Sequence, residues 1–299
     1  KRNEDYIKYL SYHDSLTRLY NRMFFEEEMR RLNTERSLPL SIIFGDVNGL
    51  KLTNDIFGHA AGDDLLRKTA EILKKVCREE DIMARMGGDE FAILLPKTSA
   101  QVALKIIKRI KNEFSKEPIG VIKYSISMGY DTKVKMNKSI EETMENAEDM
   151  MYKEKMLNRK IIDSSMIQTI IETLHNASER EKQHSINVSK LCQNIGRALK
   201  LPEPEIRKLK EAGYLHDIGK IVLGNEILKK NEKLTEEEKK EMQQHPVVGY
   251  RILNLFGETL DIAEGVLHHH EGWDGSGYPK GLKGEEIPKL ARIIKVAES

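Results

Sequence analysis

The chain has 299 residues, enough for two average domains, and 39% of them are hydrophobic, so each domain can bury a core. Charged residues make up 32%, yet the net charge is only +1, which argues against a general polyanion-binding surface and against nucleic acid as a partner. No apolar run is long enough to span a membrane, and the opening Lys1-Arg2-Asn3-Glu4-Asp5 is not a signal peptide.

Strand and helix signals alternate in the first half of the chain. The apolar run 40–47 predicts a buried strand, and 64–76 has the apolar spacing of a helix. Apolar runs on either side of Gly87-Gly88-Asp89-Glu90 predict a hairpin. A further helix, an alternating strand and a last helix are expected at 103–114, 122–130 and 139–158. This order predicts an α+β domain, with an antiparallel-containing sheet and flanking helices.

The second half has helical patterns throughout. Apolar stripes occupy 188–199, 206–214, 247–255 and 260–267, and Pro202 is placed to begin a helix. An all-α domain is therefore expected. We place the domains at 1–162 and 163–299, and because the join lacks Gly and Pro, a continuous helix is expected across it.

Two further features concern the surroundings of the protein. Cys77 and Cys192 lie in apolar-periodic stretches and are expected to be reduced core residues, which favours the cytoplasm. The first residue is not Met and the last stretch ends in mid-pattern, so we expect a piece of a longer protein. The segment 6–10 would continue a helix from an upstream sensory part.

Two adjacent glycines followed by two adjacent acids form an unusual turn. Gly87 and Gly88 permit a positive φ and leave room for a ligand near the backbone. Asp89 stands at the hairpin tip and Asp46 at the end of the first strand, and together they can share a hard cation such as Mg²⁺. On spacing alone, a solvated acidic turn explains the same residues equally well.

Several motifs in the same order resemble the GGDEF family of diguanylate cyclases over about 14–162. They are Asp14-Ser15-Leu16-Thr17, Asn21-Arg22, the segment GDVNGLKLTND at 45–55, Phe57-Gly58-His59, Gly62-Asp63, and 85–91. The resemblance implies a nucleotidyl-cyclase-like fold that binds GTP and makes cyclic di-GMP. It implies Mg²⁺ (or Mn²⁺) held by Asp46, the Val47 carbonyl and Asp89, with Asn54, Asp63 and His59 around the guanine.

The same resemblance implies further roles. Asp89 or Glu90 would help deprotonate the attacking hydroxyl. Phosphate contacts would come from Arg85, Lys155 and Arg159, although each is otherwise explained as an exposed basic side chain. Arg78 and Asp81 would bind the product as an inhibitor. Because each domain holds one GTP, activity requires a homodimer. Arg18 and Asn48 depart from the family pattern, which has Gly and Asp there.

Seven of the nine histidines follow residue 170. His216-Asp217 at a helix end can reach one metal or bridge two, and His184, His245, His269 and His270 add candidate ligands. A hydrogen-bonded core histidine explains any one of them, but not so many together. The mixed His/carboxylate set suits Fe or Mn better than a structural zinc.

Together with His216-Asp217, the run HHEGWDGSGYP at 269–279 resembles the HD-GYP family of cyclic di-GMP phosphodiesterases, from about Met166 onward. The resemblance implies a two-metal site, with Asp217 as the bridge and Lys220 stabilising the phosphate charge. Its ligands would be His184, His216, Asp217, His245, His269, His270 and Glu298. The loop residues Asp274, Gly275, Gly277, Tyr278 and Pro279 would frame the ligand pocket.

Three positions depart from this second pattern. Glu298 stands where the family has Asp, Arg180 where some members have a third-metal Glu, and His268 extends the usual His pair. We interpret His268 as non-ligating. Relative to the family, this domain is expected to be C-terminally truncated.

The leading hypothesis is a bifunctional enzyme. Two GTP give cyclic di-GMP in the first domain, and the second hydrolyses cyclic di-GMP to pGpG or GMP. The alternatives are a protein in which only one domain is active and the other is regulatory, and a nucleotide-binding receptor.

Overall fold

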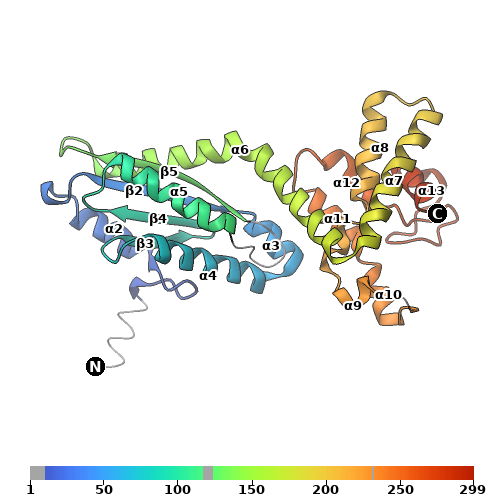
Figure 1. Cartoon of the computed structure of the whole chain (residues 1–299), viewed down its shortest axis with the longest axis horizontal. Helices are drawn as coiled ribbons and strands as arrows, with labels where there is room; N and C mark the ends of the chain where they lie inside the picture. Colours follow the sequence, from blue (N-terminus) through green and yellow to red (C-terminus); the bar gives the residue numbers. More distant parts are fainter. Residues whose placement is uncertain (1–10, 117–123, 231) are drawn as a thin grey trace. The chain divides into compact units, whose positions relative to one another are not determined.

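The computed structural model describes residues 11–116, 124–230 and 232–299. The chain divides into two compact units that meet in the sequence at Met166 and Ile167. One contains a sheet with flanking helices, and the other is helical (Figure 1). The expected segment 6–10 and the first residues of the expected strand 122–130 lie outside the described residues.

The sheet of the first unit has five strands in the order β1-β3-β4-β2-β5. β1, which the sequence did not predict, runs parallel to β3. The other neighbours are antiparallel, which confirms the antiparallel-containing sheet that the sequence predicts. All nine residues of β2 are buried because β2 pairs on both edges and is covered on both faces. The strands are Tyr20–Asn21 (β1), Leu40–Asn48 (β2), Ile82–Gly87 (β3), Glu90–Leu95 (β4) and Ser125–Lys133 (β5).

Helices cover this sheet because its buried residues alternate between the two faces. Phe25 and Met29 of α2 and Met151 of α6 pack with Ile42 and Phe44 of β2 in one apolar cluster. The helix expected at 64–76 begins earlier, where Gly58 has a φ of +83°. The described helices of this unit are α2 (Arg22–Arg31), η1 (Glu35–Ser37), α3 (Leu50–Phe57), α4 (His59–Val76), α5 (Ala100–Lys116) and the first part of α6 (Ile140–Ala177).

Helix α6 is a single helix of 38 residues. It passes the end expected at 158 without a break, so the expected continuous helix is present. Ala147 and Met151 are buried near its beginning, and Ile170 and Leu174 are buried near its end. The two ends of α6 therefore each contribute to a core.

The second unit is all-helical, as predicted. α7 and α8 pack closely where glycines leave room, since a Cβ on Gly213 would lie 2.9 Å from the Cys192 sulfur. Ser178 caps α7 by accepting a hydrogen bond from the Glu181 N–H. The elements are α7 (Glu179–Ala198), α8 (Glu203–Leu215), η2 (Ile218–Val222), α9 (Asn225–Leu228), α10 (Glu236–Met242), α11 (His245–Leu253), α12 (Leu260–Leu267), η3 (Gly284–Glu286) and α13 (Lys289–Glu298).

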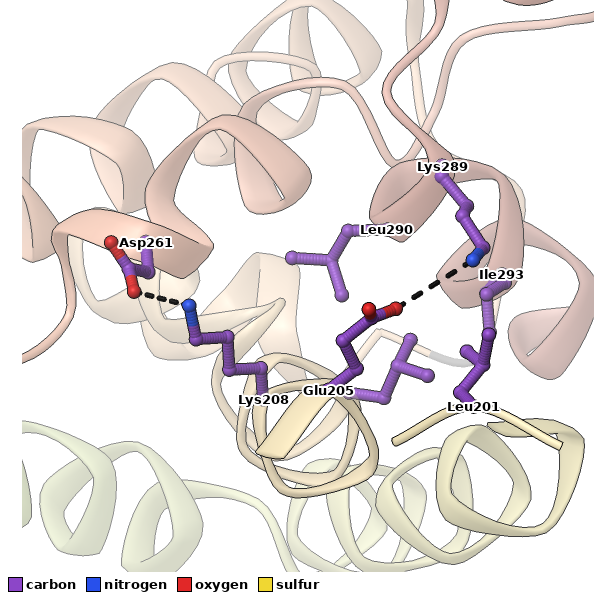
Figure 2. A pocket seen from close by; sticks show the side chains of 8 residues that line it. Leu201, Glu205, Lys208, Asp261, Lys289, Leu290 and Ile293 are labelled. Carbon is purple, nitrogen blue, oxygen red and sulfur yellow. Dashed lines mark hydrogen bonds and ion pairs between the residues drawn. The ribbon is translucent and has the colours of Figure 1, made fainter. Parts of the chain in front are cut away.

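A groove of about 200 Å³ is lined by residues of α8, α12 and α13 (Figure 2). Leu201, Leu209, Leu290 and Ile293 line its apolar part. Its charged residues pair with one another, Lys208 with Asp261 and Lys289 with Glu205. These two ion pairs therefore link α8 to α12 and to α13 across the groove.

Both cysteines are free, and burial raises the pKa of each thiol to about 12. Cys192 is buried, as expected of a core residue, whereas Cys77 is only partly buried and lines a cavity. Within the described ranges, no helix has the length and apolarity that crossing a membrane requires.

Candidate metal centre and nucleotide site

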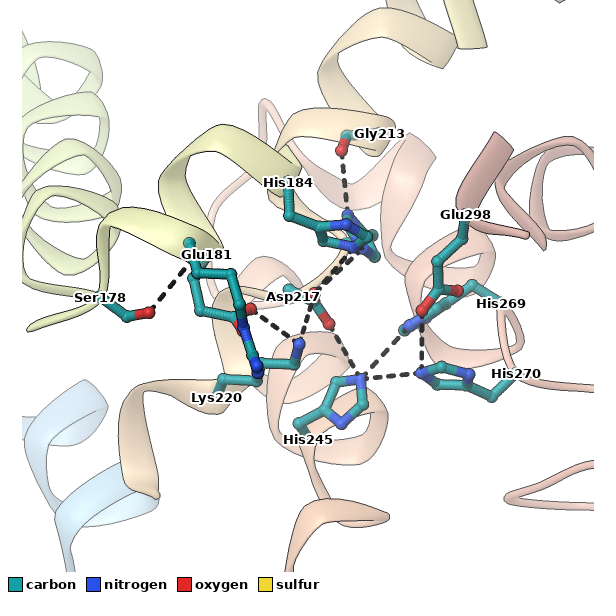
Figure 3. A network of polar contacts seen from close by, with 12 residues as sticks. Ser178, Glu181, His184, Gly213, Asp217, Lys220, His245, His269, His270 and Glu298 are labelled. Carbon is teal, nitrogen blue, oxygen red and sulfur yellow. Dashed lines mark hydrogen bonds and ion pairs between the residues drawn. The ribbon is translucent and has the colours of Figure 1, made fainter. Parts of the chain in front are cut away.

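The metal-ligand candidates of the second unit converge from the ends of several helices (Figure 3). His184 lies on α7, His216 and Asp217 directly follow α8, and His245 begins α11. His269 and His270 follow α12, and Glu298 is the last residue of α13. They form two groups whose ligand atoms lie within 4.8 Å of one another, Asp217 with His245, His269 and His270, and His184 with His216 and Glu298.

Asp217 stands between the two groups. Its Oδ1 lies 3.1 Å from Nε2 of His245, in the first group. Its Oδ2 lies 3.1 Å from Nε2 of His216 and 3.5 Å from Nε2 of His184, in the second group. One carboxylate oxygen therefore faces each group, which is the geometry that a bridging ligand requires.

Backbone carbonyls orient three of the imidazoles. Nδ1 of His216 lies 2.9 Å from the Gly213 oxygen, and Nδ1 of His269 lies 2.6 Å from the Val266 oxygen. His245 is held in the same way by the carbonyl three residues before it. Because a carbonyl only accepts, each Nδ1 carries the proton and donates it, so each Nε2 lone pair points into the centre.

These lone pairs face one another at short range. Nε2 of His245 lies 3.2 Å from Nε2 of His270 and 3.3 Å from Nε2 of His269. Both oxygens of Asp217 and Oε2 of Glu298 are also buried without a hydrogen bond to a described residue, although Lys220 forms an ion pair with Oδ2 of Asp217. The imidazole lone pairs and Oδ1 of Asp217 converge and repel one another unless a cation lies between them, so the residues fit metal ions.

The electrostatics favour the ligating protonation states of Asp217, His269 and His270. Burial alone would raise the pKa of Asp217, but His216 and Lys220 outweigh burial and hold that pKa well below its usual range. Burial, with neighbouring imidazoles, lowers the pKa of His269 strongly and that of His270 to about 3. A carboxylate and neutral imidazoles are the forms that bind metal.

Lys220 lies beside this centre. Its Nζ is 2.8 Å from Oδ2 of Asp217 and 2.8 Å from Oε2 of Glu181. Burial opposes the charge, but the two carboxylates raise the pKa of Lys220 above its usual value, so the side chain is a fixed cation.

The glycine-rich loop lies against the metal-ligand candidates. The Tyr278 ring stacks on His270 with centroids 4.8 Å apart. A Cβ on Gly277 would lie 2.2 Å from the Gly272 nitrogen, so only glycine allows this close approach. Gly275 has a φ of +82°, whereas Asp274 and Pro279 are exposed on the loop.

The first unit gathers its predicted metal and catalytic residues at one edge of the sheet. Asp46 of β2 is the cross-strand partner of Glu90 in β4, and the Val47 N–H donates to the Asp89 carbonyl at 3.0 Å. Burial, opposed by Lys155, raises the pKa of Asp46. Burial and nearby carboxylates raise the pKa of Glu90.

Lys155 makes direct contact with this edge. Its Nζ lies 2.7 and 2.8 Å from the two oxygens of Asp46. Among the described residues, Asp46, Asp89 and Glu90 do not form a close group of three ligand atoms like those of the second unit. In this structure a lysine therefore neutralises the carboxylate that the sequence assigns to a metal.

The predicted guanine-binding residues lie around the corner between α3 and α4. Asn54 is near the end of α3, and a Cβ on Gly62 would lie 2.0 Å from its side-chain oxygen. The missing side chain of Gly62 thus seats Asn54 against α4. Asp63 is half-buried on α4, and His59 is exposed at its first position.

The remaining predicted phosphate contacts already have protein partners. The Arg85 guanidinium donates Nε and Nη2 to the Gly88 carbonyl at 3.0 and 2.8 Å, and its Nη1 lies 3.3 Å from Asp14. Arg159 is exposed, with its Nε 3.7 Å from Asp163. Arg85 thus braces the turn at 87–90.

The predicted product-binding pair lines a cavity of about 410 Å³. The Arg78 N–H donates to Oδ2 of Asp81 at 2.8 Å. Asp81 is buried, and burial raises its pKa, while the Arg78 side chain is exposed.

Comparison with known proteins decides the family. Residues 11–161 match the family model for the diguanylate cyclase GGDEF domain. The chain belongs to this family. Residues 165–299 match the model for the HD domain, so a GGDEF unit is followed by an HD unit.

Three curated relatives illustrate both halves. The chain is 45% identical over 35% of its length to the cyclic di-GMP phosphodiesterase response regulator RpfG of Xanthomonas campestris, of which the match covers 28%. It is 32% identical over 52% of its length to diguanylate cyclase DgcM of Escherichia coli, with 38% covered. It is 30% identical over 70% of its length to 3'3'-cGAMP-specific phosphodiesterase 1 of Vibrio cholerae, with 48% covered. The chain thus spans less than half of each relative.

The sequence patterns assigned no role to two buried acids of the HD unit, Glu181 and Glu271. Glu181 lies three residues before His184 on α7, so helical spacing would have placed both on one face. Glu271 accepts hydrogen bonds from the Lys280 and Leu282 N–H groups at 2.8 and 3.0 Å and so anchors the glycine-rich loop. His268 lies beside Glu271, outside both metal-ligand groups.

Proposed function

We propose that the HD unit hydrolyses cyclic di-GMP to pGpG and GMP with two metal ions, iron or manganese. The observation that carries this proposal is the position of Asp217, which presents one oxygen to each ligand group. The donor set contains imidazoles and carboxylates but no thiolate, which suits iron or manganese. Glu298 fills the place of the family's Asp and belongs to the second group.

The residues around the metal-ligand groups have distinct parts in this proposal. A bound metal pair supplies positive charge for the phosphodiester and activates water. Lys220 has three donors, of which two are engaged by Asp217 and Glu181, so the third remains for a phosphate oxygen. Tyr278, stacked on His270, frames the ligand from the side of the loop.

For the GGDEF unit we propose condensation of two GTP into cyclic di-GMP. Asp46, the Val47 carbonyl and Asp89 would hold Mg²⁺ or Mn²⁺, and Glu90 would assist proton transfer. Asn54, Asp63 and His59 would bind guanine, while Lys155, Arg159 and Arg85 stay predicted phosphate contacts. Because one unit offers one such site, synthesis requires a homodimer. The product would inhibit by binding Arg78 and Asp81.

One observation favours a second candidate, in which the GGDEF unit is a regulatory nucleotide-binding module. Lys155 already neutralises Asp46, so a divalent ion must compete with an ammonium for that carboxylate. The two candidates differ in whether GTP is consumed.

Chromatography of nucleotides tests both activities. The full chain is incubated with GTP and Mg²⁺, and separately with cyclic di-GMP and Mn²⁺ or Fe²⁺. A third incubation uses 3'3'-cGAMP, because one relative is a phosphodiesterase specific for that dinucleotide. We expect Asp89→Ala to abolish synthesis alone and Asp217→Asn to abolish hydrolysis alone. GTP left intact at high protein concentration refutes synthesis and favours the regulatory module.

A metal readout separates the site from its activity. With Asp89→Ala in the background to remove the proposed metal ligand of the GGDEF unit, the chain should bind two equivalents of Mn²⁺ in equilibrium dialysis, and Asp217→Asn should lose metal from both groups because it is the proposed bridge. Asp274→Asn, on the exposed part of the loop, is the matched control. Full metal content in Asp217→Asn contradicts the bridging role.

A further inference from the structure

Arg18 adopts a backbone conformation that usually belongs to glycine. Its φ is +58°, and among the described residues other than glycine only Lys97 and Lys200 share a positive φ. The turn that holds it is tightly bonded. Thr17 donates its N–H and hydroxyl to the Asp14 carboxylate at 2.8 and 2.7 Å, and the Arg18 N–H donates to the Asp14 carbonyl. A side chain kept in this unfavourable region points to a function for that side chain.

The turn forms one wall of the cavity that contains Arg78 and Asp81. Arg18 and Lys74 line the same cavity, and the Lys74 ammonium lies 3.4 Å from the Arg18 carbonyl. Three cationic residues, Arg18, Lys74 and Arg78, therefore line one cavity. None of them is among the residues that the GGDEF resemblance assigns to GTP.

The cavity also offers groups that suit a nucleobase. His13 and Tyr20 line it, with ring centroids 4.7 Å apart. Asp81 is a buried carboxylate in the wall and accepts N–H donors. Tyr20 also stacks on Phe24 with centroids 3.9 Å apart, so its ring is held firmly in the wall. Cations and a carboxylate acceptor beside these rings match a ligand with phosphates and a guanine base, since each part has a partner of suitable chemistry.

We propose that Arg18 is an additional phosphate-binding residue of this feedback pocket. The inference rests on the proposed product inhibition at Arg78 and Asp81 and extends it. Arg18 supplies a cation from the turn before β1. Arg78 and Asp81, just before β3, line another part of the same cavity.

Calorimetric binding of cyclic di-GMP to the full chain tests the proposal. All proteins carry Asp217→Asn, so that the ligand is not consumed. The binding event that Arg78→Ala removes defines the feedback pocket. Arg18→Gly keeps the left-handed backbone and removes only the side chain, and we expect it to weaken that event about 5- to 10-fold.

Lys97→Gly is the matched control, because it also removes a cation from an exposed residue with a positive φ, at 52°. It should leave the affinity unchanged. An affinity of Arg18→Gly equal to that of the parent, with Arg78→Ala weakened, overturns the role of Arg18 alone. If Arg78→Ala removes no binding event, the feedback pocket itself is refuted. Equal weakening by Lys97→Gly shows a general charge effect and also overturns the proposal.

Discussion

Replacing Arg85 by lysine perturbs the support of the turn at 87–90 without changing the acids Asp89 and Glu90. Arg85 donates two hydrogen bonds to the Gly88 carbonyl and lies 3.3 Å from Asp14. A lysine keeps the charge but offers one compact ammonium in place of the planar fork. Gly87 and Gly88 have φ values of +154° and +51° and carry no side chains that could hold the turn.

The magnitude follows from the contacts. The forked donation to one carbonyl is a charge-assisted hydrogen bond, about 1.5–3 kcal/mol. The pair with Asp14, whose side chain is 22% exposed, adds only about 0.2–1 kcal/mol. If Arg85→Lys keeps roughly half of this total, the turn loses about 1–2 kcal/mol, or about 5- to 30-fold in its equilibrium for local opening.

Amide hydrogen exchange followed by NMR measures this opening directly. The Val47 amide donates to the Asp89 carbonyl across the turn, so its protection should fall about 5- to 30-fold in Arg85→Lys. Amides in the middle of α4 should stay protected. Arg31→Lys is the matched control, because Arg31 also forms a fork with one partner, Glu28, but on the surface of α2. Unchanged protection of Val47, or an equal loss in the control, would refute the bracing role.

Two further predictions concern the buried acids of the HD unit. Glu181→Gln removes one of the two carboxylates that hold the Lys220 ammonium, so thermal unfolding should show a loss of about 1–3 kcal/mol, whereas the exposed Glu179→Gln should change little. An equal effect of both variants would rule out a specific pairing. Glu271→Gln replaces one acceptor oxygen by an amide donor, and the exchange protection of Lys280 N–H or Leu282 N–H should fall about tenfold. Full protection of both amides would show that the loop is anchored elsewhere.

The sequence by itself determined many of the elements and their order, although it did not predict β1, α2 or α3. Strand β2 and the hairpin β3–β4 follow from apolar runs and a turn with two glycines, and local backbone preferences decide both. Helical spacing without Gly or Pro likewise predicted that α6 would run on without a break. Histidine spacing and motif order also placed every proposed metal ligand of the HD unit in advance, although their roles stay predictions.

Tertiary structure alone decided which charged groups meet. Lys155 contacts Asp46 over 109 residues of sequence, and Arg85 reaches Asp14 over 71. Glu181 pairs with Lys220 because the start of α7 lies beside η2, which no local pattern encodes. Asp217 likewise lies between the two ligand groups only because helix packing brings His245 to one of its oxygens and His216 to the other. Backbone propensities act between neighbours, whereas long charged side chains take whichever partner the packed helices and strands bring within reach.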